Sequence, residues 1–332
     1  MPIYHMENEK MLKRHQLLQN KLRQFGFITQ NAALLNQLEM MERIVPTDIS
    51  VLITGESGTG KNILAEYIHK NSPRKNNNFI TLDVGCLSPQ IIESELFGHV
   101  KGSFTSAVSD HKGAFERAQN GTIFLDEITE LDLNLQKKLL RVLEDKVIRR
   151  LGGEREIRLD LRIITATNKD IRQLVKSGKF RQDLYYRLNE TTVHLPPLRE
   201  RPEDIGPICQ FFLDIYNKQY AKKISSVSTA AMSLMQDYSW PGNIRELRNV
   251  IKSATALSKR EVLWIEDLNI FSKSTADTNP QFNGIKPLDT LEKEYLLYAL
   301  KIFDGNKTKT AQALDISRPR LQRILERHKI AE

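Results

Sequence analysis

The sequence has little cysteine and no long apolar run. Its 332 residues include only two cysteines, Cys86 and Cys209, which lie far apart. Two isolated cysteines provide neither a disulfide framework nor the spacing of a metal site, which favours a reducing compartment. No stretch approaches the roughly 20 apolar residues of a bilayer-spanning helix, and the polar N-terminus "MPIYHMENEKMLKRHQ" is not typical of a signal peptide. We therefore expect a cytoplasmic protein with no membrane partner.

The composition excludes global disorder. Hydrophobic residues make up 40% of the chain and charged residues 27%, which is enough apolar surface to build a core. The length favours two domains, or one large domain with an appendage. The net charge of +8 is compatible with an anionic partner such as nucleic acid, although many cytosolic proteins share a basic balance. Charge alone therefore does not decide the function.

Short apolar segments alternate with helical patterns in the first part of the chain. The segments "SVLIT", "FITLDV", "TIFLD" and "RIITAT" are separated by stretches with helical features, which predicts an α/β fold with a parallel sheet covered by helices. Beyond about residue 203 only helical patterns remain, until a stretch rich in Ser, Thr, Asn, Pro and Gly indicates a linker. The parts we predict are a helical extension at 1–27, an α/β subdomain at 28–203, a helical subdomain at 204–268, a linker at 269–287 and an all-α domain at 288–332.

A glycine-rich loop follows the first apolar strand. The stretch "GESGTGKN" (55–62) opens the helical segment "KNILAEYIHK", and strand, glycine loop and helix in that order are the context that a P-loop needs. Backbone N–H groups and the helix N-terminus would bind phosphate oxygens. Lys61 would reach the β- and γ-phosphates, whereas Asn62 stands where the generic motif has a Ser or Thr for Mg²⁺. The alternative is a simple glycine turn before a helix. The residues expected at the phosphates are Gly55, Glu56, Ser57, Gly58, Thr59, Gly60, Lys61 and Asn62.

Two acidic residues end the strand in "GTIFLDEI" (121–128). Ligands bind at the carboxyl ends of strands in open α/β sheets, so Asp126 suits Mg²⁺ and Glu127 suits the attacking water. Asn168 ends the next strand, "RIITATN", and is placed to polarise the same water. Each of these residues could instead belong to a solvated turn, but the P-loop upstream favours the catalytic interpretation.

Two arginines, Arg181 and Arg187, follow in "FRQDLYYRL". An isolated arginine on a helix is usually surface charge. A nucleotide site that lacks only a cation at the γ-phosphate favours a catalytic interpretation, and such arginines can come from a neighbouring subunit.

Taken together, these stretches resemble the AAA+ domain of bacterial enhancer-binding proteins, the sigma-54-dependent transcription activators. The resemblance covers about residues 28–332 and rests on blocks in matching order, among them "VLITGESGTGK", "ESELFGHVKGSFTSA", "GTIFLDEI", "LRIITATN", "FRQDLYYRL", "LPPLRERPEDI" and "WPGNIREL". It implies a P-loop NTPase with a helical lid that uses ATP and Mg²⁺. It also implies a ring oligomer, usually a hexamer, with ATP sites between subunits.

The resemblance assigns roles residue by residue. The glycine loop with Lys61 is similar to Walker A, where the family usually has Glu at the position of Asn62. Asp126 and Glu127 are similar to Walker B and Asn168 to sensor I. The remaining positions are Arg181 and Arg187 as fingers acting in trans, Arg245 as sensor II reaching the nucleotide from the lid, and Asp83 as the residue that couples nucleotide state to movement, where Asn is common.

The loop "GSFTSA" (102–107) is similar to the family's GAFTGA loop, which contacts sigma-54. Phe104 and Thr105, the contact residues, are intact, whereas Ser103 replaces Ala and Ser106 replaces the second Gly. Losing that Gly removes a residue that adopts positive φ freely, so we expect the loop's shape to differ from the family's. The partner-binding residues implied by the resemblance are Gly102, Ser103, Phe104, Thr105, Ser106 and Ala107.

The C-terminal segment 288–332 predicts three short helices, of which the last begins after Ser317 as N-cap. Its apolar residues Leu321, Ile324 and Leu325 would face a core, which leaves a basic surface for the major groove of double-stranded DNA. The segment resembles the Fis-type helix–turn–helix. The alternative is a basic solvated helix that closes a bundle. The residues expected to face DNA are Arg318, Arg320, Gln322, Arg323 and Arg327.

Three functions remain open at this point. The first is an ATP-driven activator that binds upstream DNA and remodels the sigma-54 RNA polymerase holoenzyme for open-complex formation. The second is a DNA-binding regulator that uses nucleotide only for oligomerisation and acts without sigma-54. The third is an ATPase that remodels another partner. No sensing domain fits in residues 1–27, so either a separate regulatory protein or expression controls the protein, or the sequence is a fragment.

Overall fold

The computed structural model describes residues 2–86, 88–104, 107–268, 288–303, 306–314 and 316–328. By internal contacts it divides into two compact units, Met1–Asn269 and Ile270–Glu332. The predicted linker at 269–287 lies outside the described residues, as do Thr105 and Ser106 of the loop at 102–107. No described helix is long and apolar enough to cross a membrane.

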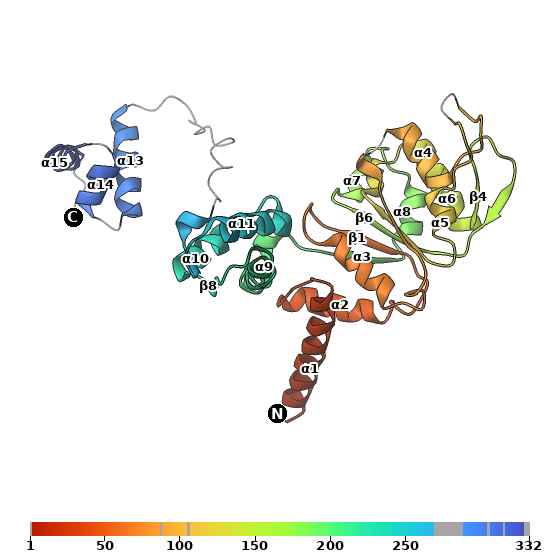
Figure 1. The fold of residues 1–332 in the computed structure, drawn as a ribbon, viewed down its shortest axis with the longest axis horizontal. Helices are drawn as coiled ribbons and strands as arrows, with labels where there is room; N and C mark the ends of the chain where they lie inside the picture. The colour runs from red at the N-terminus through yellow and green to blue at the C-terminus, as the bar shows by residue number, and fades with distance from the viewer. Residues whose placement is uncertain are drawn as a thin grey trace. The chain divides into compact units, whose positions relative to one another are not determined.

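A five-stranded parallel sheet forms the centre of the first unit (Figure 1). The strands lie in the order β2-β3-β6-β1-β7 and every neighbouring pair is parallel. This confirms the predicted parallel α/β sheet. The sequence did not mark β7, because "TTVH" alternates polar and apolar residues and is only four residues long. The strands are β1 (Val51–Thr54), β2 (Phe79–Asp83), β3 (Thr122–Asp126), β6 (Arg162–Thr167) and β7 (Thr191–His194).

Each face of the sheet has its own apolar core. Successive strand residues point to opposite faces, so Phe124 packs into one core and its neighbours Ile123 and Leu125 into the other. The helices on the first face are α1 (Pro2–Gln24), α2 (Ala32–Glu42) and α3 (Lys61–Lys70). Those on the second are α4 (Pro89–Phe97), α5 (Ala114–Arg117), α6 (Leu133–Asp145), α7 (Ile171–Lys176) and α8 (Gln182–Leu188).

Helix α1 lies within the predicted helical extension at 1–27 and packs against the rest of the first unit. Leu18 and Leu22 are buried in the first core, and His15 hydrogen-bonds Asn36 on α2 at 3.0 Å. The described part of α1 therefore folds with the ATPase-like unit.

The helical part that follows the sheet contains α9 (Ile205–Tyr220), α10 (Thr229–Asp237) and α11 (Asn243–Leu257). The expectation that strands end near residue 203 was wrong in one detail. Two-residue strands β8 (Ser226–Val227) and β9 (Val262–Leu263) pair in parallel. They are too short to leave a periodic pattern in the sequence, and they join the chain before α10 to the chain after α11.

The described residues of the second unit form the helices α13 (Leu288–Ile302), α14 (Lys307–Ala313) and α15 (Arg318–Arg327). Their core includes Leu296, Ala311, Leu321 and Leu325. The predicted inward position of Leu321 and Leu325 is therefore confirmed. Tyr295 on α13 is 62% exposed.

Candidate nucleotide site

Residues 55–60 connect β1 directly to α3. Gly58 and Gly60 have φ values of 82° and 106°, which favour glycine. A Cβ on Gly58 would lie 2.4 Å from the carbonyl oxygen of Gly242 in the lid, so the close approach of the two backbones requires glycine here. Lys61 is buried, and its Nζ donates to the carbonyl oxygens of Gly55 at 2.9 Å and Glu56 at 3.3 Å.

The two predicted acids lie beside Lys61 at the carboxyl end of β3. The Glu127 Oε1 atom is 3.6 Å from Lys61 Nζ, and Glu127 adopts a left-handed φ of 54° that turns it back toward the loop. Burial raises the pKa of Asp126, while the charge of Lys61 and a hydrogen bond from Asn62 oppose that shift. The carboxylates suit a divalent cation, and the buried Lys61 ammonium group beside them suits phosphate oxygens.

Asn168 supports this acid through its backbone. Its amide N–H donates to Glu127 Oε2 at 3.0 Å. The preceding residue, Thr167, hydrogen-bonds Thr129 through their hydroxyls at 2.8 Å, and both are buried. The end of β6 is thereby tied to the turn after β3, which fixes the direction of the Glu127 carboxylate.

Asp83 ends β2 directly opposite Asp126 in the parallel register. Its two carboxylate oxygens accept hydrogen bonds from the Gly85 amide at 2.9 Å and from the Cys86 thiol at 3.1 Å. The bond to Asp83 raises the pKa of the Cys86 thiol. In this conformation Asp83 shapes its own turn, and its negative charge adds to the raised pKa of Asp126.

The lid is hydrogen-bonded to the phosphate loop by the start of α11. Arg245 donates to the Ser57 hydroxyl at 2.7 Å, and the Ile244 amide donates to the Gly58 carbonyl at 3.0 Å. The side-chain Nδ2 of the buried Asn243 donates to the Ser57 carbonyl at 3.0 Å. The structure therefore brings Arg245 to the loop, as the resemblance implies.

The segment "LPPLRERPEDI" contributes site residues to which sequence reasoning gave no role. Arg199 forms a bidentate pair with Glu56, at 2.9 and 2.7 Å, which together with Asn243 lowers the pKa of that carboxyl. Arg201 is fully buried and donates to the Thr59 carbonyl at 3.1 Å. The buried Arg201 guanidinium needs such a partner, but no local sequence signal marks either arginine.

Asp204 completes this arrangement beneath the loop. It is fully buried, lies 3.5 Å from the Arg201 guanidinium and accepts a hydrogen bond from the Gln30 amide. Burial raises the pKa of Asp204. The pair thus connects the P-loop to the chain that precedes α2.

A cavity of about 400 Å³ opens over these groups. One part is polar, with the phosphate loop and the two acids, and another is apolar and aromatic. This division suits a nucleotide, because the phosphates need N–H groups and cations while the base can stack on aromatic rings. The lining residues are Phe25, Gly26, Ser57, Gly58, Gly60, Lys61, Asn62, Ile63, Asp126, Glu127, Phe211, Phe212, Ile244, Arg245 and Arg248.

Arg181 and Arg187 do not belong to this set of described lining residues. Arg181 forms a bidentate pair with Asp183 at 3.0 and 2.6 Å on the surface of α8. Arg187 is half-exposed, lies 3.8 Å from Glu190 and lines a different cavity. Their own subunit does not bring them to the nucleotide site.

The loop at 102–107 rises from a stem in which the backbones of His99 and His111 exchange hydrogen bonds at 3.1 and 2.9 Å. Phe104 is 41% exposed, and its ring lies edge-on to His99 with centroids 4.9 Å apart. The Gly102 amide donates to the Ala107 carbonyl at 2.9 Å, which closes the loop. Ser103 is partly buried, and a Cβ on Gly152 would lie 2.7 Å from its Cβ.

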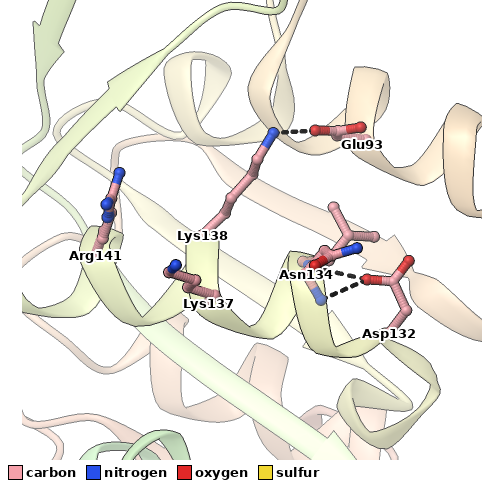
Figure 2. A pocket seen from close by; sticks show the side chains of 7 residues that line it. Glu93, Asp132, Asn134, Lys137, Lys138 and Arg141 are labelled. Carbon is pink, nitrogen blue, oxygen red and sulfur yellow. Dashed lines mark hydrogen bonds and ion pairs between the residues drawn. The ribbon is translucent and has the colours of Figure 1, made fainter.

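A second cavity, of about 510 Å³, lies between α4 and the first half of α6 (Figure 2). Asp132 caps α6 by accepting from the amides of Asn134 and Leu135, and Lys138 pairs with Glu93 on α4. None of the predicted nucleotide residues lines it. The pair between Lys138 and Glu93 joins α4 to α6. Helix α4 precedes the loop at 102–107, and α6 precedes the hairpin of β4 (Val147–Arg149) and β5 (Glu156–Arg158).

In the second unit, the polar side chains of α15 lie outside. Arg318, Arg320, Gln322 and Arg323 are exposed. Arg327 differs, because its guanidinium pairs with Glu292 and lies 3.8 Å from Asp289, both on α13. Ser317 occupies the N-cap position without a side-chain capping bond.

A parallel sheet, a phosphate loop, an acid pair and a helical lid together define a P-loop ATPase-type protein of the AAA+ class. The family models agree: a sigma-54 interaction domain matches residues 27–194, an AAA+ ATPase lid domain 199–283, and a bacterial regulatory protein of the Fis family 287–328. The chain belongs to the family of sigma-54-dependent transcriptional regulators.

Curated relatives and solved structures match nearly the whole chain. It is 41% identical to the regulatory protein AtoC of Escherichia coli K12 over 95% of this chain and 70% of that one. It is 40% identical to the transcriptional regulatory protein ZraR of Klebsiella oxytoca, over 92% and 69% respectively. The crystal structure of NtrX from Brucella abortus in complex with ADP has a TM-score of 0.69 at 32% identity, over 91% of this chain and 70% of that chain. NtrX has also been crystallised in complex with ATP.

Proposed function

We propose that this protein hydrolyses ATP in a ring oligomer and uses the energy to remodel sigma-54 RNA polymerase at a promoter, while its C-terminal unit holds it on upstream DNA. The observation that carries the ATPase part is that Lys61, Glu127 and Arg245 line one cavity. Membership of the family supports the choice of polymerase. The exposed basic side chains of α15 support a DNA role.

In this proposal Lys61 exchanges its two carbonyl partners for the β- and γ-phosphate oxygens of ATP. The amides of the loop and the start of α3 bind the remaining phosphate oxygens. Arg245, which now bonds Ser57, reaches the same phosphates from the lid. Because the lid and the loop share hydrogen bonds, nucleotide binding and lid position are coupled.

The acid pair fits Mg²⁺, which prefers oxygen ligands. Asp126 supplies a carboxylate and Asn62 an amide oxygen, and both residues line the same cavity. Bound there, Mg²⁺ would neutralise charge that develops on the phosphates. Glu127 orients the attacking water and accepts its proton, and the Asn168 amide fixes one of its oxygens for that purpose.

The arginine that completes the site comes from a neighbouring subunit. Arg187 lines a cavity away from its own nucleotide site, and a cation at the γ-phosphate contributes about 10³- to 10⁵-fold in rate. Arg181 would accompany it. Asp83, opposite Asp126 in the sheet, would pass the nucleotide state on to α4 and the loop at 102–107.

A substitution at Phe104 tests the proposed contact of the loop at 102–107 with sigma-54. It is exposed and is not among the described residues that line the nucleotide cavity, so Phe104→Ala should retain ATP turnover and lose open-complex formation on a sigma-54 promoter. ATPase rate and promoter melting, measured on the same preparation with and without ATP, check this. Leu133→Ala, which truncates another exposed side chain of the same unit, is the matched control.

Unchanged open-complex formation by the Phe104→Ala protein would contradict the assignment of the loop. ATP turnover by the wild-type protein with no melting of any sigma-54 promoter would instead favour an ATPase with another partner. A protein that binds DNA and nucleotide without turnover would favour the regulator that uses nucleotide only to oligomerise.

A further inference from the structure

Arg187 lies at the opposite end of the sheet from its own phosphate loop. It lines a cavity of about 470 Å³ together with Asp48, Ser50 and Lys146. Ser50 immediately precedes β1, whereas the phosphate loop follows the last residue of that strand. A residue that positions Arg187 must therefore be sought at the amino ends of the strands.

Glu190 lies in the two-residue connection between α8 and β7 and contacts both sides of this cavity. Its Oε2 accepts a hydrogen bond from the buried Ser50 amide at 3.0 Å. Its Oε1 lies 3.8 Å from the Arg187 guanidinium. One carboxylate thus connects the start of a central strand to the predicted finger.

The other acids of the cavity have a different partner. Asp48 accepts two hydrogen bonds from Arg74, at 2.9 and 2.8 Å, and Asp160 accepts a third at 2.6 Å. Glu190 is the one carboxylate within 4.0 Å of Arg187 in the part of the chain that the structure describes.

A second cation also faces Arg187. Lys146 follows α6 with a left-handed φ of 53°. The pKa of its ammonium group is lowered, mainly by burial and next by the charge of Arg187. Among the described residues, the one hydrogen bond of the Arg187 side chain is a long one, 3.5 Å, to the Leu143 carbonyl. Without Glu190, repulsion from Lys146 would act on Arg187 with little to oppose it.

We propose that Glu190 is the positioning residue for Arg187. It holds the Arg187 guanidinium of one subunit in the position and orientation needed to meet the γ-phosphate bound by the neighbouring subunit. This rests on the proposed function, in which Arg187 acts in trans. Glu190 touches no nucleotide, so its effect on hydrolysis passes entirely through Arg187.

The test uses Glu190→Gln, which keeps an oxygen to accept from the Ser50 amide and removes the charge that faces Arg187. We expect kcat for ATP to fall about tenfold with KM nearly unchanged, because a misplacement of the order of 1 Å can cost up to about 10²-fold. Arg187→Ala should lose about 10³-fold or more. Glu144→Gln, an exposed carboxylate on α6, should leave kcat unchanged, and thermal unfolding checks that each variant is folded.

Mixed rings separate a positioning role from a local structural one. Lys61→Ala subunits cannot bind ATP but carry an intact Arg187, so mixing them with Glu190→Gln subunits should raise the rate per competent site toward the wild-type value. A rate that only falls in proportion to dilution would overturn the proposal, as would unchanged or increased kcat for Glu190→Gln alone. If Arg187→Ala subunits also fail to recover when mixed with Lys61→Ala, the trans-acting finger itself is wrong, and the proposed function rather than Glu190 has failed.

Discussion

The candidate nucleotide site and α15, the helix proposed to face DNA, use arginine in opposite ways. Around the phosphate loop, Arg201 is fully buried and Arg199 is bonded to Glu56 in a bidentate pair. On α15, Arg320 and Arg323 are exposed. The first kind fixes a geometry inside the subunit, whereas the second is left available for an anion outside it.

This contrast predicts how substitutions will act. A buried or bonded group near the loop should change hydrolysis or stability, while an exposed one should change binding to a partner and little else. The following three experiments test that separation.

The largest effect is expected for Glu127→Gln. The amide keeps the shape and the bond to the Asn168 amide but cannot take a proton, so hydrolysis should fall about 10²- to 10⁴-fold. ATP binding should persist, which equilibrium binding and single-turnover kinetics would measure. The control is Glu130→Gln, three residues after Glu127. The Glu130 carboxylate pairs with Lys169 at 2.6 Å. Normal turnover by the Glu127→Gln protein would remove it from the catalytic assignment.

Arg201→Leu should be next in size and should act on stability. Removing one member of a buried ion pair leaves Asp204 without its cation, which costs about 3–5 kcal/mol. Burial already raises the pKa of Asp204, so its ionised form destabilises the fold and the loss grows as pH rises through that pKa. Thermal unfolding at acidic and neutral pH measures both the loss of stability and its dependence on pH. A variant as stable as wild type, or one that gains stability with rising pH, would show that the pair is not needed.

The smallest effect is expected for Arg320→Ala on DNA. Loss of one exposed cation should weaken binding by about 1–3 kcal/mol if it reads a base, and less if it contacts phosphate. ATP turnover should not change. Titration of DNA at several salt concentrations distinguishes the two, with Arg260→Ala in the lid as a variant of equal charge. If the two variants bind DNA equally well, the exposed face of α15 is only a solvated surface.

The sequence was sufficient for those parts that local patterns specify. The parallel sheet followed from apolar strands alternating with helices, and the phosphate loop from glycines between a strand and a helix. Leu321 and Leu325 were placed correctly because helical spacing puts them on one face.

Contacts between distant segments were not predictable in the same way. The bonds of Arg199 to Glu56 and of Arg201 to Thr59 join residues more than a hundred positions apart, and nothing local distinguishes these arginines from surface charge. Strands β8 and β9 were missed because two residues carry no period. The helical extension at 1–27 was predicted without its packing, because only the contacts of α1 with α2 and the core show where its apolar residues lie.

Strand β7 has a consequence for what the chain tolerates in length. It is four residues long and separates Arg187, which would serve a neighbour, from Arg199, which is bonded to its own subunit's loop. Its register with β1 places Val193 in the core. Inserting or deleting one residue would turn Val193 outward and shift one of the arginines by about 3.3 Å along the strand. If Arg187 serves the neighbouring subunit as proposed, the length of β7 sets the spacing between two ATP sites, and we expect substitutions of its polar residues to be tolerated better than a change in its length.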